Sequence, residues 1–171
     1  AVKSALIRYA KKLRFEGKPI EKNVYIVLKD TNLELITDLI MMTISKEAII
    51  SRLDEIMKLV SNARFFQLTQ GVKTFTFILP RELYKGIIDI IGIWNVIEML
   101  NNQAAIVMIN PPRIMTTPGI VAYITTLLAF NGINITQIIS CYIDTVLVLN
   151  EEDSYKAFYI LRELITKFRK H

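Results

Sequence analysis

A stretch without a single charged side chain, from Ile114 to Ile143, constrains the fold of this chain more than any other feature. Charged residues make up 22% of the sequence, so this gap indicates either a membrane span or a segment buried on several faces. A membrane-spanning helix needs about 20 consecutive, mainly apolar residues. Threonines, asparagines, glycines and a proline interrupt the stretch at short intervals. We therefore predict a buried segment and no membrane partner.

The polar residues inside this stretch predict a helix, a turn and then a strand. Thr117 is the predicted N-cap of the helix, and Pro118 occupies its first position. The helix is predicted over Ile120–Phe130 and ends at Asn131-Gly132, where a glycine tolerates positive φ. From Ile133 an apolar strand leads to a tight turn and a second strand.

The rest of the chain also alternates between helical and strand patterns. Ser45 is the predicted cap of a helix with an apolar stripe at helical spacing, formed by Ile49, Leu53, Ile56 and Val60. The other predicted strands are 33–44, a hairpin at 64–79, 104–110 and a hairpin at 135–149. Further helices are predicted at 81–92 and from 151 onward, the latter with a buried stripe of Ala157, Leu161, Leu164 and Phe168. Residues 21–32 fit either a strand or a short helix.

The predicted elements follow the same order in the two halves of the chain. The helix near 46 corresponds to that near 118, the hairpin near 64 to that near 135, and the helix near 81 to that near 152. A βαββα(β) unit of this length is the ferredoxin-like plan, with helices on one face of an antiparallel sheet. We predict an α+β fold with an N-terminal helix at 1–18, a divergent unit at 19–100 and a second unit at 101–171. Uncovered faces and strand edges predict a homo-oligomer.

The net charge of +5 lies entirely in residues 1–18. Apolar residues recur there at helical spacing, so the segment is a predicted amphipathic helix with a cationic outer face. Two interpretations stay open. The segment is either a solvated helix docked on the body or the edge of a nucleic-acid-binding module, whose phosphate contacts are Arg8, Lys11, Lys12 and Arg14.

The single cysteine, Cys141, and the single histidine, His171, exclude several chemistries. Disulfide frameworks, Cys/His zinc sites and His-dependent catalytic triads need more of these residues than one chain supplies. Cys141 lies among apolar residues of a predicted strand, so we expect an inert, buried thiol in a reducing, cytoplasmic setting. The carboxylates show no metal-ligand or paired-acid spacing, and there is no Gly-rich phosphate loop. We therefore expect no enzymatic activity, no metal and no cofactor.

The segment Thr117–Tyr123, followed by Gly132–Ile135, resembles the ACT domain, a small-ligand-sensing module of many enzymes and regulators of amino-acid metabolism. Ser140–Thr145 and Glu151–Asp153 resemble a narrower group, the archaeal ACT-containing predicted regulators of amino-acid metabolism. In that group a DNA-binding helix-turn-helix precedes the ACT part, and Ala5–Leu13 resembles its end. We expect the remaining helices of such a segment upstream of this chain, with DNA as their partner.

The resemblance implies a regulatory module that binds a small amino acid. The alternative is a nucleic-acid-associated protein whose ACT-like units serve mainly as an oligomerisation scaffold. Asn134 matches the ligand-contacting Asn of the family's Gly-x-Asn motif, whereas Thr116 stands where amino-acid-binding members often have Asn or Asp.

The start of the predicted helix at Ile120 suits a ligand on physical grounds as well. Gly119 lacks a Cβ, so a ligand can approach the backbone closely, and the amides of a helix N-terminus attract a carboxylate. The predicted ligand site consists of Thr116, Thr117, Pro118, Gly119, Ile120, Asn134, Ile135 and Gln137.

Overall fold

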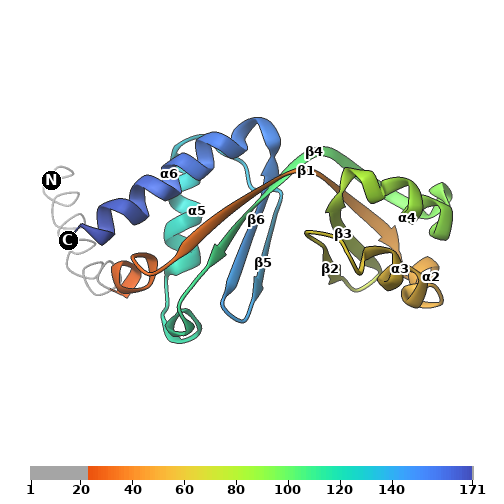
Figure 1. The fold of residues 1–171 in the computed structure, drawn as a ribbon, viewed down its shortest axis with the longest axis horizontal. Coiled ribbons are helices and arrows are strands. Elements are labelled where there is room, and N and C mark those ends of the chain that lie inside the picture. The colour runs from red at the N-terminus through yellow and green to blue at the C-terminus, as the bar shows by residue number, and fades with distance from the viewer. Residues whose placement is uncertain (1–22, 171) are drawn as a thin grey trace, which may run out of the picture. The chain divides into compact units, whose positions relative to one another are not determined.

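The computed structural model describes residues 23–170 (Figure 1). The predicted helix of residues 1–18, with its candidate phosphate contacts Arg8, Lys11, Lys12 and Arg14, lies outside the described residues, as does His171. Residues 23–28 are helical and residues 29–30 form a turn, so the described part of the ambiguous segment 21–32 is mainly a short helix before the strand that begins at Asn32.

The strands and helices follow one another in a repeated order. The strands are β1 (Asn32–Ser45), β2 (Gln67–Gln70), β3 (Thr74–Pro80), β4 (Val96–Ile109), β5 (Gln137–Cys141) and β6 (Asp144–Asn150). The helices are α2 (Lys46–Ile50), α3 (Leu53–Val60), α4 (Tyr84–Ile91), α5 (Ile120–Phe130) and α6 (Glu151–Arg169), with short 3-10 turns η1 (Arg81–Leu83), η2 (Ile93–Asn95) and η3 (Pro112–Thr116). The order strand, helix, two strands, helix thus occurs twice, and the predicted α+β repeat is confirmed.

The strand order in the sheet is β2-β3-β1-β4-β6-β5. The pairs β1–β3 and β2–β3 are antiparallel. Contacts divide the chain into two units, and unit 2 consists of Leu35–Ile106 and Val148–Ser154. Unit 1 consists of Val107–Leu147 with the described residues up to Glu34 and from Tyr155 onward. These two units come from contacts in space, whereas the predicted domain ranges 19–100 and 101–171 come from the order of elements along the sequence. Those ranges therefore stay a prediction.

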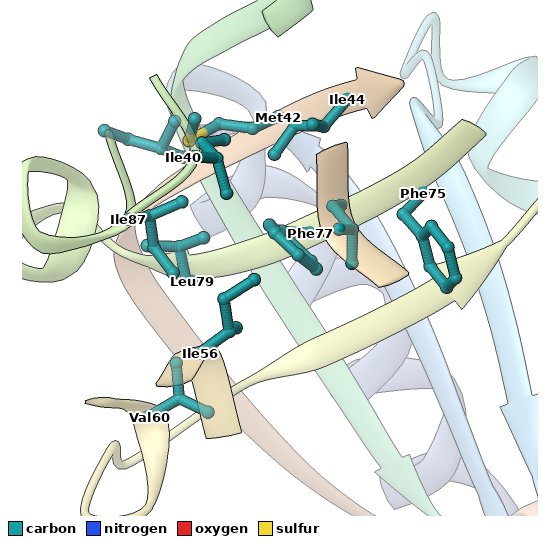
Figure 2. Close-up of a cluster of buried hydrophobic side chains, with 11 residues drawn as sticks. Ile40, Met42, Ile44, Ile56, Val60, Phe75, Phe77, Leu79 and Ile87 are labelled. Carbon is teal, nitrogen blue, oxygen red and sulfur yellow. The ribbon is translucent and has the colours of Figure 1, made fainter. Parts of the chain in front are cut away.

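The core of unit 2 forms between the paired strands β1 and β3 and the helices α2, α3 and α4 (Figure 2). In the antiparallel register Met42 lies opposite Phe77 and Ile44 lies opposite Phe75. Because side chains alternate across a strand, every second residue points to the same face. Helices cover that face. The buried residues of this core are Ile40, Met42 and Ile44 of β1, Phe75, Phe77 and Leu79 of β3, Ile49 of α2, Ile56 and Val60 of α3, and Ile87 and Ile91 of α4. The predicted hairpin with one packed face is therefore confirmed.

The helix predicted from residue 46 is interrupted. It forms two helices, α2 and α3, because Arg52 adopts φ −119° and ψ 5°, outside the helical region. Leu53 follows this break and is 36% exposed, so of the predicted apolar stripe only Ile49, Ile56 and Val60 are buried. Ser45 is the N-cap residue, as predicted, but its side chain makes no hydrogen bond to the helix.

Unit 1 is built around α5 and α6, which lie on the same side of β5 and β6 (Figure 1). The bounds predicted for α5 are confirmed, and Gly132 closes it with φ 74°. The buried residues of the two helices are Ile120, Ile124 and Leu128 of α5 and Ala157, Leu161 and Ile165 of α6. The stripe predicted for α6 is thus partly wrong: Leu164 and Phe168 are only half-buried, because the buried positions continue at intervals of four residues to Ile165.

Other differences lie at strand ends. β4 begins at Val96, well before the predicted residue 104, and β5 begins at Gln137 rather than at Ile133. Cys141 is exposed, so the expectation of a buried thiol is wrong. It ends β5, the last strand in the sheet order, where no neighbouring strand covers it. None of the helices in residues 23–170 combines the length and hydrophobicity that crossing a bilayer requires.

A truncation in the unit 2 core tests this packing. Phe77 is fully buried, so Phe77→Ala should lower the free energy of unfolding by about 3–5 kcal/mol. Val72 is 90% exposed, and Val72→Ala should change it by less than about 0.5 kcal/mol. Urea denaturation measures both values, and similar effects of the two substitutions would contradict the assigned core.

Candidate functional site

A cavity of about 460 Å³ lies beside the start of α5 in unit 1. It is lined by residues of η3, of the turn and first positions of α5, and of the end of the β5 hairpin: Ile114, Met115, Thr117, Gly119, Ile120, Val121, Ala122, Ser140 and Tyr142. Met115 is 58% exposed and Tyr142 is 70% exposed, so the cavity is reachable from solvent. Its lining combines apolar side chains with hydroxyl groups and the backbone of a helix start.

The backbone around Gly119 differs from the expected helix start. Thr117 is not the N-cap: its hydroxyl donates back to the Arg113 carbonyl over 2.7 Å. The N-cap is Gly119, with φ 92° and ψ −7°. This left-handed conformation strains any residue that has a Cβ, so glycine determines where the helix begins. The predicted cap at Thr117 is therefore wrong, and Gly119 has the central role.

No side chain caps the amides at the start of α5. The first intrahelical bond across this turn runs from the Tyr123 amide to the Gly119 carbonyl over 2.9 Å. The N–H groups before it have no acceptor within a helix, and they carry partial positive charge. Since Ile120, Val121 and Ala122 all line the cavity, this helix start offers hydrogen-bond donors to a bound oxygen atom.

Tyr142, which also lines the cavity, has a strained backbone conformation. It occupies the turn between β5 and β6 with φ 53°, which is uncommon for a bulky residue. Such outliers cost about 1–3 kcal/mol and concentrate at functional sites. The Ile143 carbonyl in the same turn accepts hydrogen bonds from the backbone N–H and the side-chain amide of Asn110, at 3.1 and 2.8 Å. The surrounding structure therefore holds this turn in place.

The structure brings together only part of the predicted site. Thr117, Gly119 and Ile120 line the cavity, and Thr116 and Pro118 belong to the same turn without lining it. The residues Asn134, Ile135 and Gln137, which lie between α5 and β5 or at the start of β5, do not line it either.

Sequence reasoning missed Ile114, Met115, Val121, Ala122, Ser140 and Tyr142 as lining residues. A signal for Ser140 and Tyr142 existed in the segment Ser140–Thr145, which carries part of the family resemblance.

The lining contains no charged side chain. The groups that this cavity offers to a ligand are therefore backbone amides, the Ser140 and Tyr142 hydroxyl groups and apolar side chains. Within residues 23–170, no three His, Cys, Asp or Glu side chains are grouped closely enough to hold a metal ion. The arrangement suits reversible binding of a small molecule with a carboxylate.

A comparison with protein families matches residues 99–163 to the ACT domain. The matched range includes α5, the whole cavity lining and the β5–β6 hairpin. No curated protein matches the chain.

Solved structures with a similar fold include aspartate kinases and their regulatory parts. The Clostridium acetobutylicum aspartate kinase is 18% identical with a TM-score of 0.63, over 80% of this chain and 34% of that enzyme. The regulatory subunit of the Thermus thermophilus aspartate kinase, in its ligand-free form, is 15% identical with a TM-score of 0.58, over 77% of this chain and 94% of the subunit. Escherichia coli aspartokinase III in complex with lysine and aspartate is 14% identical with a TM-score of 0.53, over 79% of this chain and 32% of that enzyme.

This chain therefore spans about a third of the length of the two kinases. At these identities the similarity shows the fold alone. Together with the family match, it confirms the predicted ACT-like, ferredoxin-like fold.

A glycine substitution tests the strain at Tyr142. Tyr142→Gly should raise the free energy of unfolding by about 1 kcal/mol, because a left-handed backbone costs roughly 1–2 kcal/mol in a residue with a Cβ. Ser140→Gly in the neighbouring strand should lower it by roughly 0.5–1 kcal/mol. Urea denaturation of both variants gives the comparison. A less stable Tyr142→Gly variant would show that the ring contributes more packing than its backbone costs.

Proposed function

We propose that this chain is a ligand-sensing regulatory module that binds a small amino acid in the cavity before α5. The observation that carries the proposal is the uncapped helix start at Gly119, which opens into a cavity of about 460 Å³. This cavity lies within the segment that matches the ACT domain, a family of ligand-sensing regulatory modules. A similar fold occurs in a kinase regulatory subunit and in an aspartokinase crystallised with lysine and aspartate, which supports an amino acid as the ligand.

The proposed binding mode follows from the lining. The ligand carboxylate accepts hydrogen bonds from the amides of the first turn of α5, where the helix dipole favours negative charge. Its side chain packs against Ile114, Met115 and Val121. The ammonium donates to hydroxyl oxygens such as that of Ser140, since no lining carboxylate is available. Asn134, Ile135 and Gln137 remain predicted contacts for ligand atoms beyond the lining.

The missing carboxylate restricts the ligands that fit. A lining carboxylate would add the attraction between two opposite charges to the hydrogen bond from the ammonium. Thr116 at the position of the family's Asn or Asp leaves only a hydroxyl in that turn. The proposed site therefore derives more of its affinity from the carboxylate and the apolar side chain than from the ammonium.

The proposed module assembles as a homo-oligomer. The exposed face of α5 carries no charge, and it contains Val121, Ala122, Thr126, Ala129 and Phe130. Phe130 is 87% exposed, a large apolar group that a monomer would leave in water. We propose that a second copy covers this face.

DNA is proposed as a partner only through the basic segment of residues 1–18. Its six cations and one carboxylate suit phosphate contacts, and the resemblance to helix-turn-helix regulators supports this role. In this proposal, ligand binding near Gly119 regulates DNA binding by the N-terminal segment. The proposal assigns none of the catalytic activity of aspartate kinases to this chain.

A pair of glycine substitutions tests the ligand site. A thermal-shift screen of the twenty amino acids identifies a ligand, and calorimetry then measures its affinity. Gly119→Val should reduce that affinity more than about tenfold, because the side chain fills the approach to the backbone. Gly132→Val is the matched control: Gly132 also has positive φ, at 74°, but nothing lies within 4 Å of an added Cβ, and the residue does not line the cavity.

Both variants should lose similar stability, whereas only Gly119→Val should lose binding. Equal affinities in the two variants would place the site elsewhere. If none of the twenty amino acids raises the melting temperature, the proposed ligand class is wrong and the scaffold alternative is favoured.

Light scattering tests the assembly. The wild-type chain should have about twice the monomer mass of 19.7 kDa at micromolar concentration. Phe130→Lys should shift it towards the monomer, since a cation replaces an apolar contact. Val72→Lys, at a site in unit 2 that is 90% exposed, should leave the mass unchanged. A monomeric wild-type protein would contradict the proposal.

A further inference from the structure

A separate cavity of about 390 Å³ lies in unit 1 beside the last turns of α6. The residues before and at the start of β1 form one wall, and one face of α6 forms the other. Its lining consists of Thr31, Asn32, Leu33, Phe158, Arg162, Ile165, Thr166 and Arg169. It shares no residue with the cavity beside Gly119.

Arg169 is held in a fixed orientation at the end of this cavity. Its Nε donates to the Lys29 carbonyl over 2.9 Å, and its Nη2 donates to the Thr31 carbonyl over 2.8 Å and to Asn32 Oδ1 over 3.2 Å. These acceptors are neutral, and within residues 23–170 the positive charge is not paired with a carboxylate. Among the described residues, no acceptor bonds Nη1, and its two N–H groups stay available.

Arg162 and Thr166 extend this donor set along the same face of α6. Residues four and seven positions apart lie on one side of a helix, which aligns Arg162, Thr166 and Arg169. Within residues 23–170, neither the Arg162 guanidinium nor the Thr166 hydroxyl makes a hydrogen bond or an ion pair. The lining thus contains two guanidinium groups and no carboxylate.

We propose that this cavity is a second ligand site, which binds a small organic anion through a phosphate or carboxylate group. Guanidinium groups match the geometry of both anions, and Arg169 is already oriented, so little side-chain freedom is lost on binding. Phe158, Ile165 and Leu33 supply an apolar wall, so the preferred anion carries an apolar or aromatic part. The site is independent of the amino-acid site proposed beside Gly119.

Two aromatic anions serve as probes, phenyl phosphate and benzoate, each titrated into the full chain at constant ionic strength. Binding is followed by calorimetry and by the amide resonances of Thr31–Leu33. We expect at least one probe to bind, and the two arms distinguish a phosphate from a carboxylate site. Arg162→Gln should weaken its binding about tenfold or more, the effect of losing a charge-assisted hydrogen bond.

The matched control is Lys167→Gln, which removes the same charge from the same helix at a residue outside this lining. It should change the affinity less than about twofold, because only non-contact electrostatics are altered. Gly119→Val should also leave the affinity unchanged, which separates this site from the amino-acid site. The proposal is overturned if neither probe binds, or if Lys167→Gln weakens binding as much as Arg162→Gln, since that result indicates a general attraction to positive charge.

Discussion

The hydrogen bonds of buried Asn110 fix the geometry on which both candidate sites depend. Its side-chain amide donates to the carbonyls of Met108 and Ile143, each over 2.8 Å, and lies 3.3 Å from Thr145 Oγ1. Its Oδ1 accepts from the Thr31 hydroxyl over 3.0 Å. A buried amide without such partners would cost several kcal/mol. Among the described residues, no buried side-chain polar atom lacks a partner.

This network connects segments that are distant in the sequence. Ile143 belongs to the turn that carries Tyr142, beside the cavity at Gly119, and Thr31 lines the cavity beside Arg169. Asn110 itself follows β4, where Pro111 and Pro112 end the strand. Substituting Asn110 would therefore remove its side-chain hydrogen bonds to Ile143 and Thr31 and loosen both cavity walls. The Ile143 carbonyl would keep only the bond from the backbone N–H of residue 110, and the Thr31 hydroxyl only its bond to the Val27 carbonyl. Hydrogen bonds of this kind specify a unique arrangement as well as adding stability.

The sequence predicted those parts of the fold that local chemistry determines. The bounds of α5 were predictable because the Pro118-Gly119 and Asn131-Gly132 turns flank an uncharged apolar run. The repeated order of elements predicted the α+β fold. Features that depend on tertiary packing were not predictable: Leu53 is exposed because Arg52 breaks a helix, and Cys141 is exposed because β5 lies at the end of the sheet order. Within the ligand site, Gly119 was foreseen, whereas Tyr142 was missed because its turn meets α5 only in the folded chain. The cavity beside Arg169 has no sequence signal, since it joins residues 31–33 to the end of α6.

The central claim is that the amides at the start of α5 bind the carboxylate of an amino acid. NMR titration with ¹⁵N-labelled protein tests this most directly, by comparing the amino acid identified as a ligand with the amine that lacks its carboxylate. The account predicts that the amino acid shifts the amide resonances of Ile120, Val121 and Ala122, and that the amine leaves them unchanged. Equal shifts with the two compounds, or shifts confined to other parts of the chain, would contradict it.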